Sequence, residues 1–223
     1  MRLFDVTGCT AQIVRPGMDL TAWAALHKPF ALCNASLYDF ATRVPIGTIF
    51  EDGKLVHDDG NGYGIGVFSD QKLCFGTPFE VQWKDFLTGY NSPVQNGKYI
   101  EPTFQDAYVF GCRLARIGIG YKQGHTYIVV DDGVTLKEFA MNAISQGITA
   151  LVNLDGGGSR HLLYNGSLIY QSPRVPYNAI AFYRETPIPQ SPDGDSSLSQ
   201  REPRCEYCTE DGRCRKWTEN TKA

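Results

Sequence analysis

The sequence predicts an α+β domain in which a few helices cover mostly antiparallel β-sheets. Short apolar or aromatic runs bounded by Gly, Asp or Asn recur along the chain, whereas only two segments show helical periodicity. The 12 Phe, 12 Tyr and 23 Gly residues also favour β-rich structure. A chain of 223 residues with 42% hydrophobic and 20% charged residues can bury a sizeable core, which excludes a largely disordered, collagen-like or coiled-coil protein.

The first predicted elements lie in the N-terminal third. A helix is expected over 20–28, because Asp19 or Thr21 can cap its start and Pro29 follows its end. Strands are expected at 29–34, 48–50 and 64–68. The sequence Glu-Asp-Gly-Lys at 51–54 predicts a hairpin turn after the second of these strands.

Further along, strands are predicted at 107–110, 117–121, 126–130, 148–154 and 179–183. A helix should start after Thr135, because Glu138 three residues later completes a capping box, and Gly147 should end it. Its apolar face is expected to consist of Leu136, Phe139, Ala140, Ala143 and Ile144. Asn165-Gly166 predicts a hairpin between strands at 162–164 and 168–170.

The chain divides into a domain over 1–184, a linker over 185–204 and a small appendage over 205–223. The linker has four Pro, four Ser and almost no apolar residues, so it cannot bury enough surface to order itself. The appendage carries Cys205, Cys208 and Cys214, whose spacing is compatible with a zinc site, although three ligands leave zinc one short. Zinc, a disulfide and free thiols all stay open for this tail, which is also a candidate for binding another protein.

The remaining four cysteines stand singly among apolar neighbours, which predicts buried thiols. They are Cys9, Cys33, Cys74 and Cys112. The net charge of −3 has no strongly basic segment, so we expect no nucleic-acid partner. Residues 1–10 lack the apolar run of a signal peptide, and no stretch approaches 18 apolar residues, so we expect a soluble, cytoplasmic protein without membrane association.

The most unusual segment is Asn153–Arg160, with the sequence N-L-D-G-G-G-S-R. Three consecutive glycines lose much backbone entropy on folding, which indicates a tight backbone approach or a row of amides directed at an anion. Asp155 stands at the carboxyl end of a predicted strand, and Ser159 and Arg160 add a hydroxyl and a cation beside it. The segment lacks the Gly-Lys-Ser/Thr of a P-loop and the spaced glycines of a dinucleotide fingerprint.

The run N-L-D-G-G-G-S resembles the signature of the phosphodiester glycosidase family. Four further blocks resemble segments of that family in the family's order, and together the blocks cover about residues 30–183. They are Asn34–Asp39 with Pro45–Gly47, Arg116–Gly120, Gly133–Ala140 and Arg174–Ala179. The sequence departs from the family pattern at Ser36, which replaces Gly, at Leu37-Tyr38, which replace two Phe, and at Arg160, which replaces a small hydroxylated residue. These departures leave the substrate preference open.

The resemblance implies a hydrolase that cleaves a sugar-1-phosphodiester at the anomeric C–O bond. It would release a free sugar similar to N-acetylglucosamine and a phosphomonoester, without a required cofactor. The first candidate for the catalytic carboxylate is Asp155, followed by Glu138 and Asp131. Candidates for substrate binding are Asn34, Arg116, Gly156, Gly157, Gly158, Ser159, Arg160, His161, Arg174 and Asn178. The family's short members without a leader occur in bacteria and their phages, which adds a phage-associated setting to the expectations.

Within this set, Arg116 and Arg174 are expected to bind phosphate oxygens, supported by the glycine amides. Asn34 and Asn178 are expected to hold sugar hydroxyls or an N-acetyl group. Structural alternatives remain for several candidates: a surface ion pair for Arg116, helix capping alone for Glu138, a turn for Asp131 and Asp132, and packing for His161.

The sequence is also compatible with two other functions. One is a carbohydrate- or phosphate-binding protein without turnover. The other is a metal-dependent phosphodiesterase that uses Asp131, Asp132 and Asp155 around a divalent cation and cleaves a P–O bond.

Overall fold

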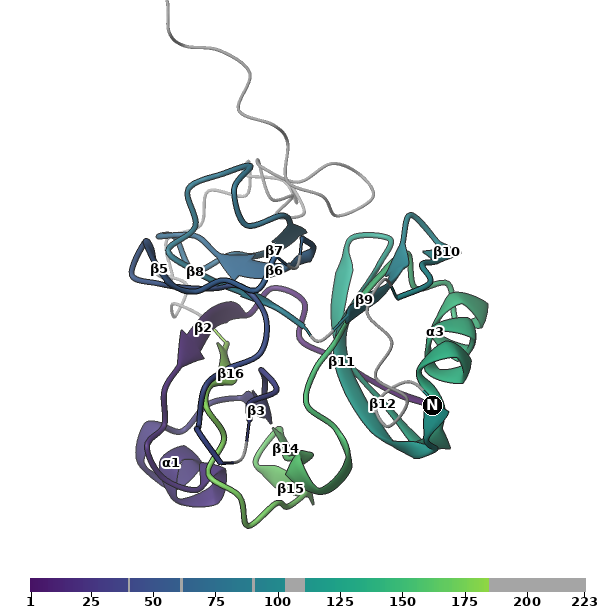
Figure 1. Ribbon diagram of the computed structural model, residues 1–223. Helices are drawn as coiled ribbons and strands as arrows, with labels where there is room; N and C mark the ends of the chain where they lie inside the picture. The colour runs from purple at the N-terminus through teal and green to yellow at the C-terminus, as the bar shows by residue number, and fades with distance from the viewer. Residues whose placement is uncertain (40, 61, 90, 103–110, 185–223) are drawn as a thin grey trace, which may run out of the picture.

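A computed structural model describes residues 1–39, 41–60, 62–89, 91–102 and 111–184. In this part of the chain, three antiparallel β-sheets surround a shared core (Figure 1). The α+β class with mostly antiparallel sheets is confirmed. The predicted strand at 107–110, the linker at 185–204 and the appendage with its three cysteines lie outside the described residues.

The first sheet has the strand order β1-β12-β11-β13-β9-β10. Its centre is the long hairpin of β11 and β12, which pairs Ile117 with Val130 and Ile119 with Ile128. The strands are β1 (Arg2–Asp5), β12 (His125–Val134), β11 (Leu114–Lys122), β13 (Ala150–Asn153), β9 (Asn91–Gln95) and β10 (Lys98–Tyr99).

The other two sheets complete the arrangement. The second has the order β15-β14-β3-β16-β2 and the third the order β5-β4-β8-β6-β7. The strands of the second are β15 (Ser167–Tyr170), β14 (Leu162–Tyr164), β3 (Ala31–Asn34), β16 (Ala179–Tyr183) and β2 (Thr10–Val14). Those of the third are β5 (Lys54–His57), β4 (Ile49–Glu51), β8 (Asp85–Thr88), β6 (Gly64–Val67) and β7 (Leu73–Gly76).

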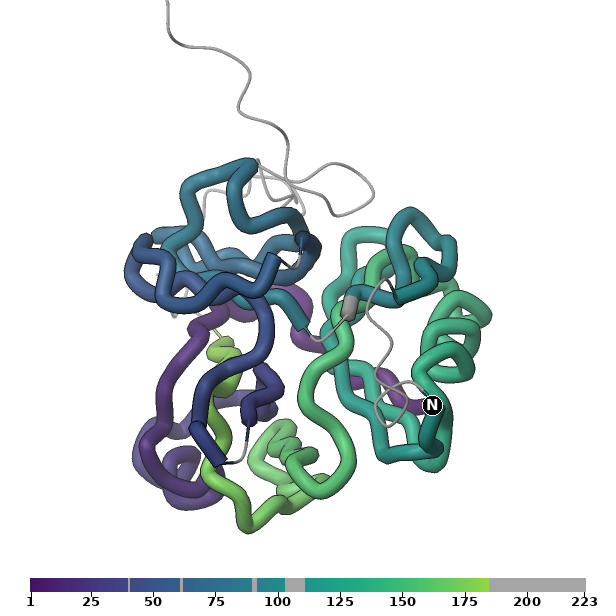
Figure 2. The backbone as a smooth tube through the Cα atoms, viewed as in Figure 1, coloured from purple at the N-terminus to yellow at the C-terminus, as the bar shows by residue number. Residues whose placement is uncertain are grey.

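One apolar core is built by the facing sides of all three sheets. Each sheet contributes side chains that are at most 1% exposed. Figure 2 shows the path of the backbone through the three sheets. They include Ile117, Ile128 and Val152 from the first sheet, Cys33, Leu162 and Ile180 from the second, and Ile65, Phe75 and Leu87 from the third. Burying such a contiguous core is the main favourable contribution to folding. The ends of β13 and β3 meet where the first two sheets adjoin.

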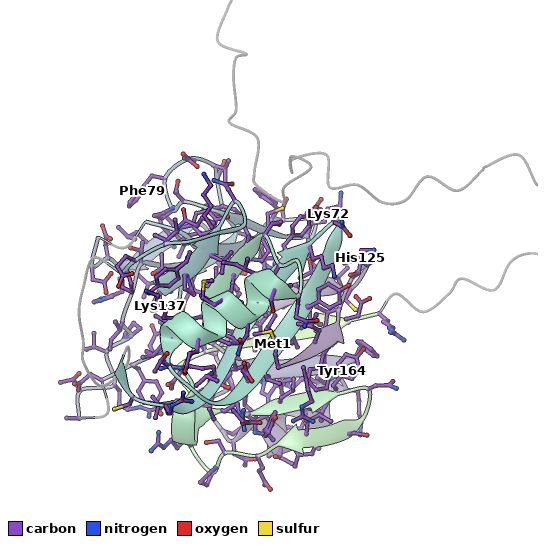
Figure 3. All side chains as sticks on the ribbon, turned by 90° about the vertical axis from the view of Figure 1, so that its right-hand side faces the viewer. Met1, Lys72, Phe79, His125, Lys137 and Tyr164 are labelled. Atoms are coloured by element: carbon purple, nitrogen blue, oxygen red, sulfur yellow. The ribbon has the colours of Figure 1, made fainter. Side chains whose placement is uncertain are left out.

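A helix covers the outer face of each of the first two sheets. Helix α1 (Leu20–His27) packs Leu20, Trp23 and Ala24 on the second sheet. Asp19 caps it by accepting a hydrogen bond from the Ala22 amide at 3.0 Å. Helix α3 (Leu136–Ser145) lies across the first sheet (Figure 3). Both predicted helices are confirmed.

The two predicted hairpin turns are also confirmed. The residue pairs Asp52-Gly53 and Asn165-Gly166 have positive φ at both positions, 47° and 74° in the first and 49° and 75° in the second. This is the type I′ geometry that matches the twist of paired strands. In contrast, seven strands were not predicted, because they are short and several carry polar residues or Pro. They are β1, β2, β5, β7, β8, β9 and β10.

The described cysteines are free thiols with different environments. Cys33 and Cys74 are buried, as predicted, whereas Cys9 is only partly buried. The prediction of a buried thiol is wrong for Cys112, which is exposed because it lies in the segment before β11, outside the sheets. Among the described residues, no helix is long and apolar enough to cross a membrane.

Candidate active site

Asp155 lies where the chain leaves the first sheet and enters the second. The Leu154 amide still donates to the Ile117 carbonyl oxygen at 2.9 Å, which extends the pairing of β13 with β11. One residue later, the Asp155 amide donates to the Ala35 carbonyl oxygen, also at 2.9 Å. The backbone of Asp155 is therefore fixed to both sheets, and its side chain has a defined position at their junction.

Each of the three glycines after Asp155 meets a different steric requirement. A Cβ on Gly156 would lie 2.4 Å from the Ala115 carbonyl oxygen, so no side chain fits there. Gly157 has a φ of +55°, which favours glycine. A Cβ on Gly158 would lie 3.2 Å from Cζ of Arg174, so the guanidinium rests against the glycine backbone.

This glycine segment also presents amides without acceptors. Within the described part of the chain, the amides of Gly156, Gly157 and Gly158 donate no hydrogen bond, whereas the Ser159 amide donates to the Gly156 carbonyl oxygen at 3.1 Å. Consecutive amides without an acceptor are able to bind an anion when they point to the same side. The interpretation of the glycine run as a close-approach segment with available amides therefore agrees with its geometry.

The side chains of Asp155, Ser159 and Arg174 form one hydrogen-bonded group. Nη1 of Arg174 donates to Oγ of Ser159 at 2.9 Å, and Ser159 is hydrogen-bonded to the Asp155 carboxyl group. Burial raises the pKa of Asp155 to about 6, although the Ser159 hydrogen bond and the Arg174 charge act in the opposite direction. A carboxyl group with such a pKa beside a cation is typical of a functional site.

Arg116 is placed differently from Arg174. Its side chain is buried, with Nη2 donating to the Cys112 carbonyl oxygen at 3.0 Å and Nε to that of Val134 at 3.3 Å. Burial lowers the pKa of its guanidinium. The cation that acts on the Asp155 carboxyl group is Arg174. Of the two arginines predicted to bind phosphate, Arg174 therefore lies beside Asp155, whereas Arg116 is hydrogen-bonded to backbone carbonyl oxygens next to the ends of β11 and β12.

The two alternative catalytic carboxylates have structural partners. Glu138 accepts from the Thr135 amide at 2.9 Å, which completes the capping box of α3, and it pairs with Arg113. The Thr135 amide lowers the pKa of Glu138. Asp131 is 7% exposed and contacts the Met1 amino group at 3.0 Å and Nδ2 of Asn142 at 2.9 Å. Burial raises the pKa of Asp131, but these hydrogen bonds outweigh it and the net direction is downward.

Arg160 joins the glycine segment to the neighbouring strands rather than to Asp155. Its Nη1 pairs with Asp132 at 2.5 Å, and its guanidinium lies over the Tyr170 ring, 3.5 Å from the centroid. The Tyr170 hydroxyl donates to Asp132 at 3.2 Å. These contacts link β12 to β15 across two sheets, and they account for the large cation that stands next to Ser159.

Asn34, His161 and Asn178 are at most 1% exposed, which places them behind the site. Nδ2 of Asn34 donates to the Asp155 carbonyl oxygen at 2.6 Å, and its Oδ1 accepts from the His161 amide at 2.8 Å. Oδ1 of Asn178 accepts from the Ser36 amide at 2.8 Å. Burial lowers the pKa of His161. In this structure the side chains of Asn34 and Asn178 support the backbone of Asp155 and of the segment that pairs with it, and a direct contact with sugar stays a prediction.

A buried residue that the sequence interpretation did not select is Ser172. It is 3% exposed and follows β15. Its Oγ donates to the Gly158 carbonyl oxygen at 2.8 Å and accepts from the Arg174 amide at 3.2 Å. Only its position two residues before Arg174 pointed to it, because a lone serine in a loop has no distinctive pattern.

The acidic residues do not assemble into a metal centre in the described ranges. These ranges hold no group of three His, Cys, Asp or Glu side chains placed to share a metal ion. Asp131 and Asp132, which the metal-dependent hypothesis combines with Asp155, are bound to other partners.

Comparison with known proteins places this geometry in a family. A protein-family model described as phosphodiester glycosidase matches residues 28–190, well over half of the chain. The chain belongs to the phosphodiester glycosidase family. The match spans all of the residues that surround Asp155.

Solved structures share the fold of this phosphodiester glycosidase family member. The catalytic domain of zebrafish N-acetylglucosamine-1-phosphodiester alpha-N-acetylglucosaminidase, auto-inhibited by its pro-peptide, is 21% identical with a TM-score of 0.64, over 79% of this chain and 73% of that chain. A hypothetical protein from Synechocystis is 15% identical with a TM-score of 0.65, over 79% and 57%. A putative exported protein from Burkholderia pseudomallei is 12% identical with a TM-score of 0.55, over 79% and 71%. Comparison with curated proteins gives no match.

Proposed function

We propose that this protein hydrolyses a sugar-1-phosphodiester at the anomeric C–O bond and releases a phosphomonoester and a free sugar similar to N-acetylglucosamine. The observation that carries the proposal is the group of Asp155, Ser159 and Arg174 beside three amides that have no acceptor among the described residues. Membership of the phosphodiester glycosidase family supports the reaction class. The zebrafish enzyme of similar fold supports the choice of sugar as a first substrate to test.

The phosphate would bind between Arg174 and the glycine segment. The guanidinium carries a positive charge directly beside Gly158, and the amides of 156–158 add donors on the same segment. A cation together with backbone amides neutralises a phosphodiester and the charge that develops on it as the bond breaks. A phosphomonoester is a weak base compared with an alkoxide, so this leaving group needs charge neutralisation more than it needs a proton.

Asp155 would act on the sugar in its ionised form, either as a nucleophile or as the base that activates water. Its pKa of about 6 keeps most of the carboxyl group ionised at neutral pH, yet close enough to ambient pH to accept a proton. Because the active form is the carboxylate, kcat/KM should fall as the pH drops below 6.

A single catalytic carboxylate is sufficient in this scheme. Ordinary glycoside hydrolysis uses a second carboxyl group to protonate an alcohol leaving group. Here Glu138 and Asp131 are hydrogen-bonded to a helix cap and to the Met1 amino group. Their occupation by structural partners agrees with chemistry in which the leaving phosphate needs no acid.

The test is turnover of UDP-N-acetylglucosamine and a panel of other sugar-1-phosphodiesters by the purified chain and two variants. Asp155→Asn should lower kcat by about a thousandfold or more, because it removes the group that attacks or activates water. Asp70→Asn is the matched control, since Asp70 is an exposed carboxylate paired with Lys72. It should leave kcat/KM within about twofold of the original.

The same assay separates the two rival functions. Loss of activity on adding a chelator would favour the metal-dependent phosphodiesterase. Binding of a sugar phosphate with no product in both the original chain and Asp155→Asn would favour the binding protein. Full activity in Asp155→Asn would contradict the role proposed for this carboxylate.

A further inference from the structure

The segment that carries Arg174 is hydrogen-bonded to the glycine segment through one buried side chain. Ser172 donates from Oγ to the Gly158 carbonyl oxygen at 2.8 Å and accepts at Oγ from the Arg174 amide at 3.2 Å. Its own amide points toward Nδ1 of His161 at 3.5 Å, a long hydrogen bond. One residue thus contacts the backbone on which the guanidinium rests and the backbone from which the guanidinium extends.

We propose that Ser172 is a positioning residue, which sets the place of the Arg174 guanidinium relative to Asp155 and the glycine amides. Its hydroxyl donates its one hydrogen to the glycine segment and accepts the Arg174 amide with a lone pair, so both hydrogen-bonding functions connect these two segments. The effect of Ser172 on catalysis rests on the proposed function, but the placement of Arg174 is measurable without any substrate.

His161 supports the same arrangement from behind. Its ring is buried, and Nδ1 faces the Ser172 amide, which requires an unprotonated Nδ1. Burial lowers the pKa of His161 and so favours the neutral ring that can accept this hydrogen bond. The other charged groups that act here are Asp19, which raises the pKa of His161, and Arg174, which lies beyond Ser172.

The neighbouring contacts show why a small displacement matters. The guanidinium of Arg174 rests 3.2 Å from the place of a Cβ on Gly158 and donates to Ser159 at 2.9 Å. Without the Ser172 hydroxyl, the Gly158 carbonyl oxygen and the Arg174 amide both lose a partner. The two segments then keep the hydrogen bond between Arg174 and Ser159 but lose the backbone contacts through Ser172, so the guanidinium is expected to shift away from the carboxyl group.

The experiment is an NMR titration of Asp155 in protein labelled with ¹³C at the aspartate carboxyl groups. The Asp155 signal is assigned by its loss in Asp155→Asn. Because the Arg174 charge lowers the pKa of Asp155, Ser172→Ala should raise that pKa by about half a unit or more. The matched control is Ser92→Ala, which removes another buried hydroxyl that donates to the Tyr63 carbonyl oxygen at 2.7 Å, and it should leave the pKa of Asp155 unchanged.

A double-mutant cycle then shows whether Ser172 acts through Arg174. Arg174→Gln should raise the pKa of Asp155 by itself, and Ser172→Ala should add nothing in that background. An unchanged pKa in folded Ser172→Ala, or an equal rise with and without Arg174, would overturn the proposal. If Ser172→Ala does not fold, Ser172→Cys replaces it, because the thiol is a weaker donor and should shift the pKa in the same direction.

Turnover gives a second readout that a merely structural role would not move. Ser172→Ala should raise KM at least fivefold for a sugar-1-phosphodiester and lower kcat less, since Arg174 binds the phosphate. If the original chain turns over no substrate, the proposed function fails, whereas the titration still decides the role of Ser172.

Discussion

Replacing Asp155 by Asn should make the protein inactive and, at alkaline pH, more stable. The pKa of the Asp155 carboxyl group is about 6 in the folded protein against an ordinary value of 3.8. Between these two values the folded state binds more protons than the unfolded state, so stability falls as the pH rises through this range. The ionised carboxylate therefore lowers the stability of the folded protein above pH 6.

The size of the effect follows from the two pKa values. The difference between about 6 and 3.8 is about 2.2 pH units, and at 1.36 kcal/mol per unit this amounts to about 3 kcal/mol above pH 6. Asn cannot ionise and has nearly the shape of the protonated acid. We therefore expect Asp155→Asn to raise the free energy of unfolding by up to about 3 kcal/mol at pH 8 and by under about 1 kcal/mol at pH 4.

The assay is urea unfolding of both proteins at pH 4, 6 and 8, followed by circular dichroism. In a thermal melt of the same proteins at pH 8, a gain of about 3 kcal/mol corresponds to a rise of about 6 to 12 °C in Tm for a domain of this size. A variant less stable than the original at pH 8, or a difference that does not change with pH, would refute the reasoning about burial of this carboxyl group.

The remaining predictions concern groups around this site. Asp131→Asn should lower the free energy of unfolding by about 1 to 3 kcal/mol at pH 8, because the hydrogen bonds of the ionised Asp131 lower its pKa and stabilise the folded state. This contribution is present above the ordinary pKa of 3.8 and is lost as the pH falls through the pKa of the folded state, so urea unfolding at several pH values measures it. Glu138→Gln should keep kcat/KM within about twofold, since Gln also completes a capping box, and a hundredfold loss would restore a catalytic role for this carboxylate. Gly158→Ala should lower kcat/KM about tenfold, because the new methyl group displaces the Arg174 guanidinium. Gly157→Ala should mainly lower the stability by about 1 kcal/mol, because φ is +55° there and the surrounding space is open. Steady-state kinetics and thermal melting distinguish the two effects. The kcat/KM of the original chain should rise with pH through about 6, and a flat profile between pH 5 and 8 would argue against a titrating Asp155.

Local sequence patterns predicted those parts of the fold that local interactions determine. The capping box of Thr135 and Glu138 needs only four residues, and the structure forms it. The turn at Asn165-Gly166 likewise depends on two residues that accept positive φ. The sheet order, in contrast, depends on long-range pairing such as Cys33 with Leu162, which no local pattern contains.

For the candidate site, whose role stays a prediction, the sequence pointed to some members and missed others. Asp155 and the glycines stand out because three consecutive glycines are costly without a steric need, and the structure shows that need at each position. Arg116 and Arg174 look alike in sequence, yet only their tertiary contacts separate a buried guanidinium on backbone carbonyls from one beside Asp155. Ser172 was missed because its importance lies entirely in contacts with segments that fold against it.

The most direct test of the account is the position of bond cleavage. The purified chain is incubated with UDP-N-acetylglucosamine in water enriched in oxygen-18, with and without a chelator, and both products are analysed by mass spectrometry. The account predicts the label in the free sugar, at an unchanged rate with chelator and with no product from Asp155→Asn. Label in the phosphate product, lost on chelation, would contradict cleavage at the anomeric carbon and would favour a metal-dependent phosphodiesterase.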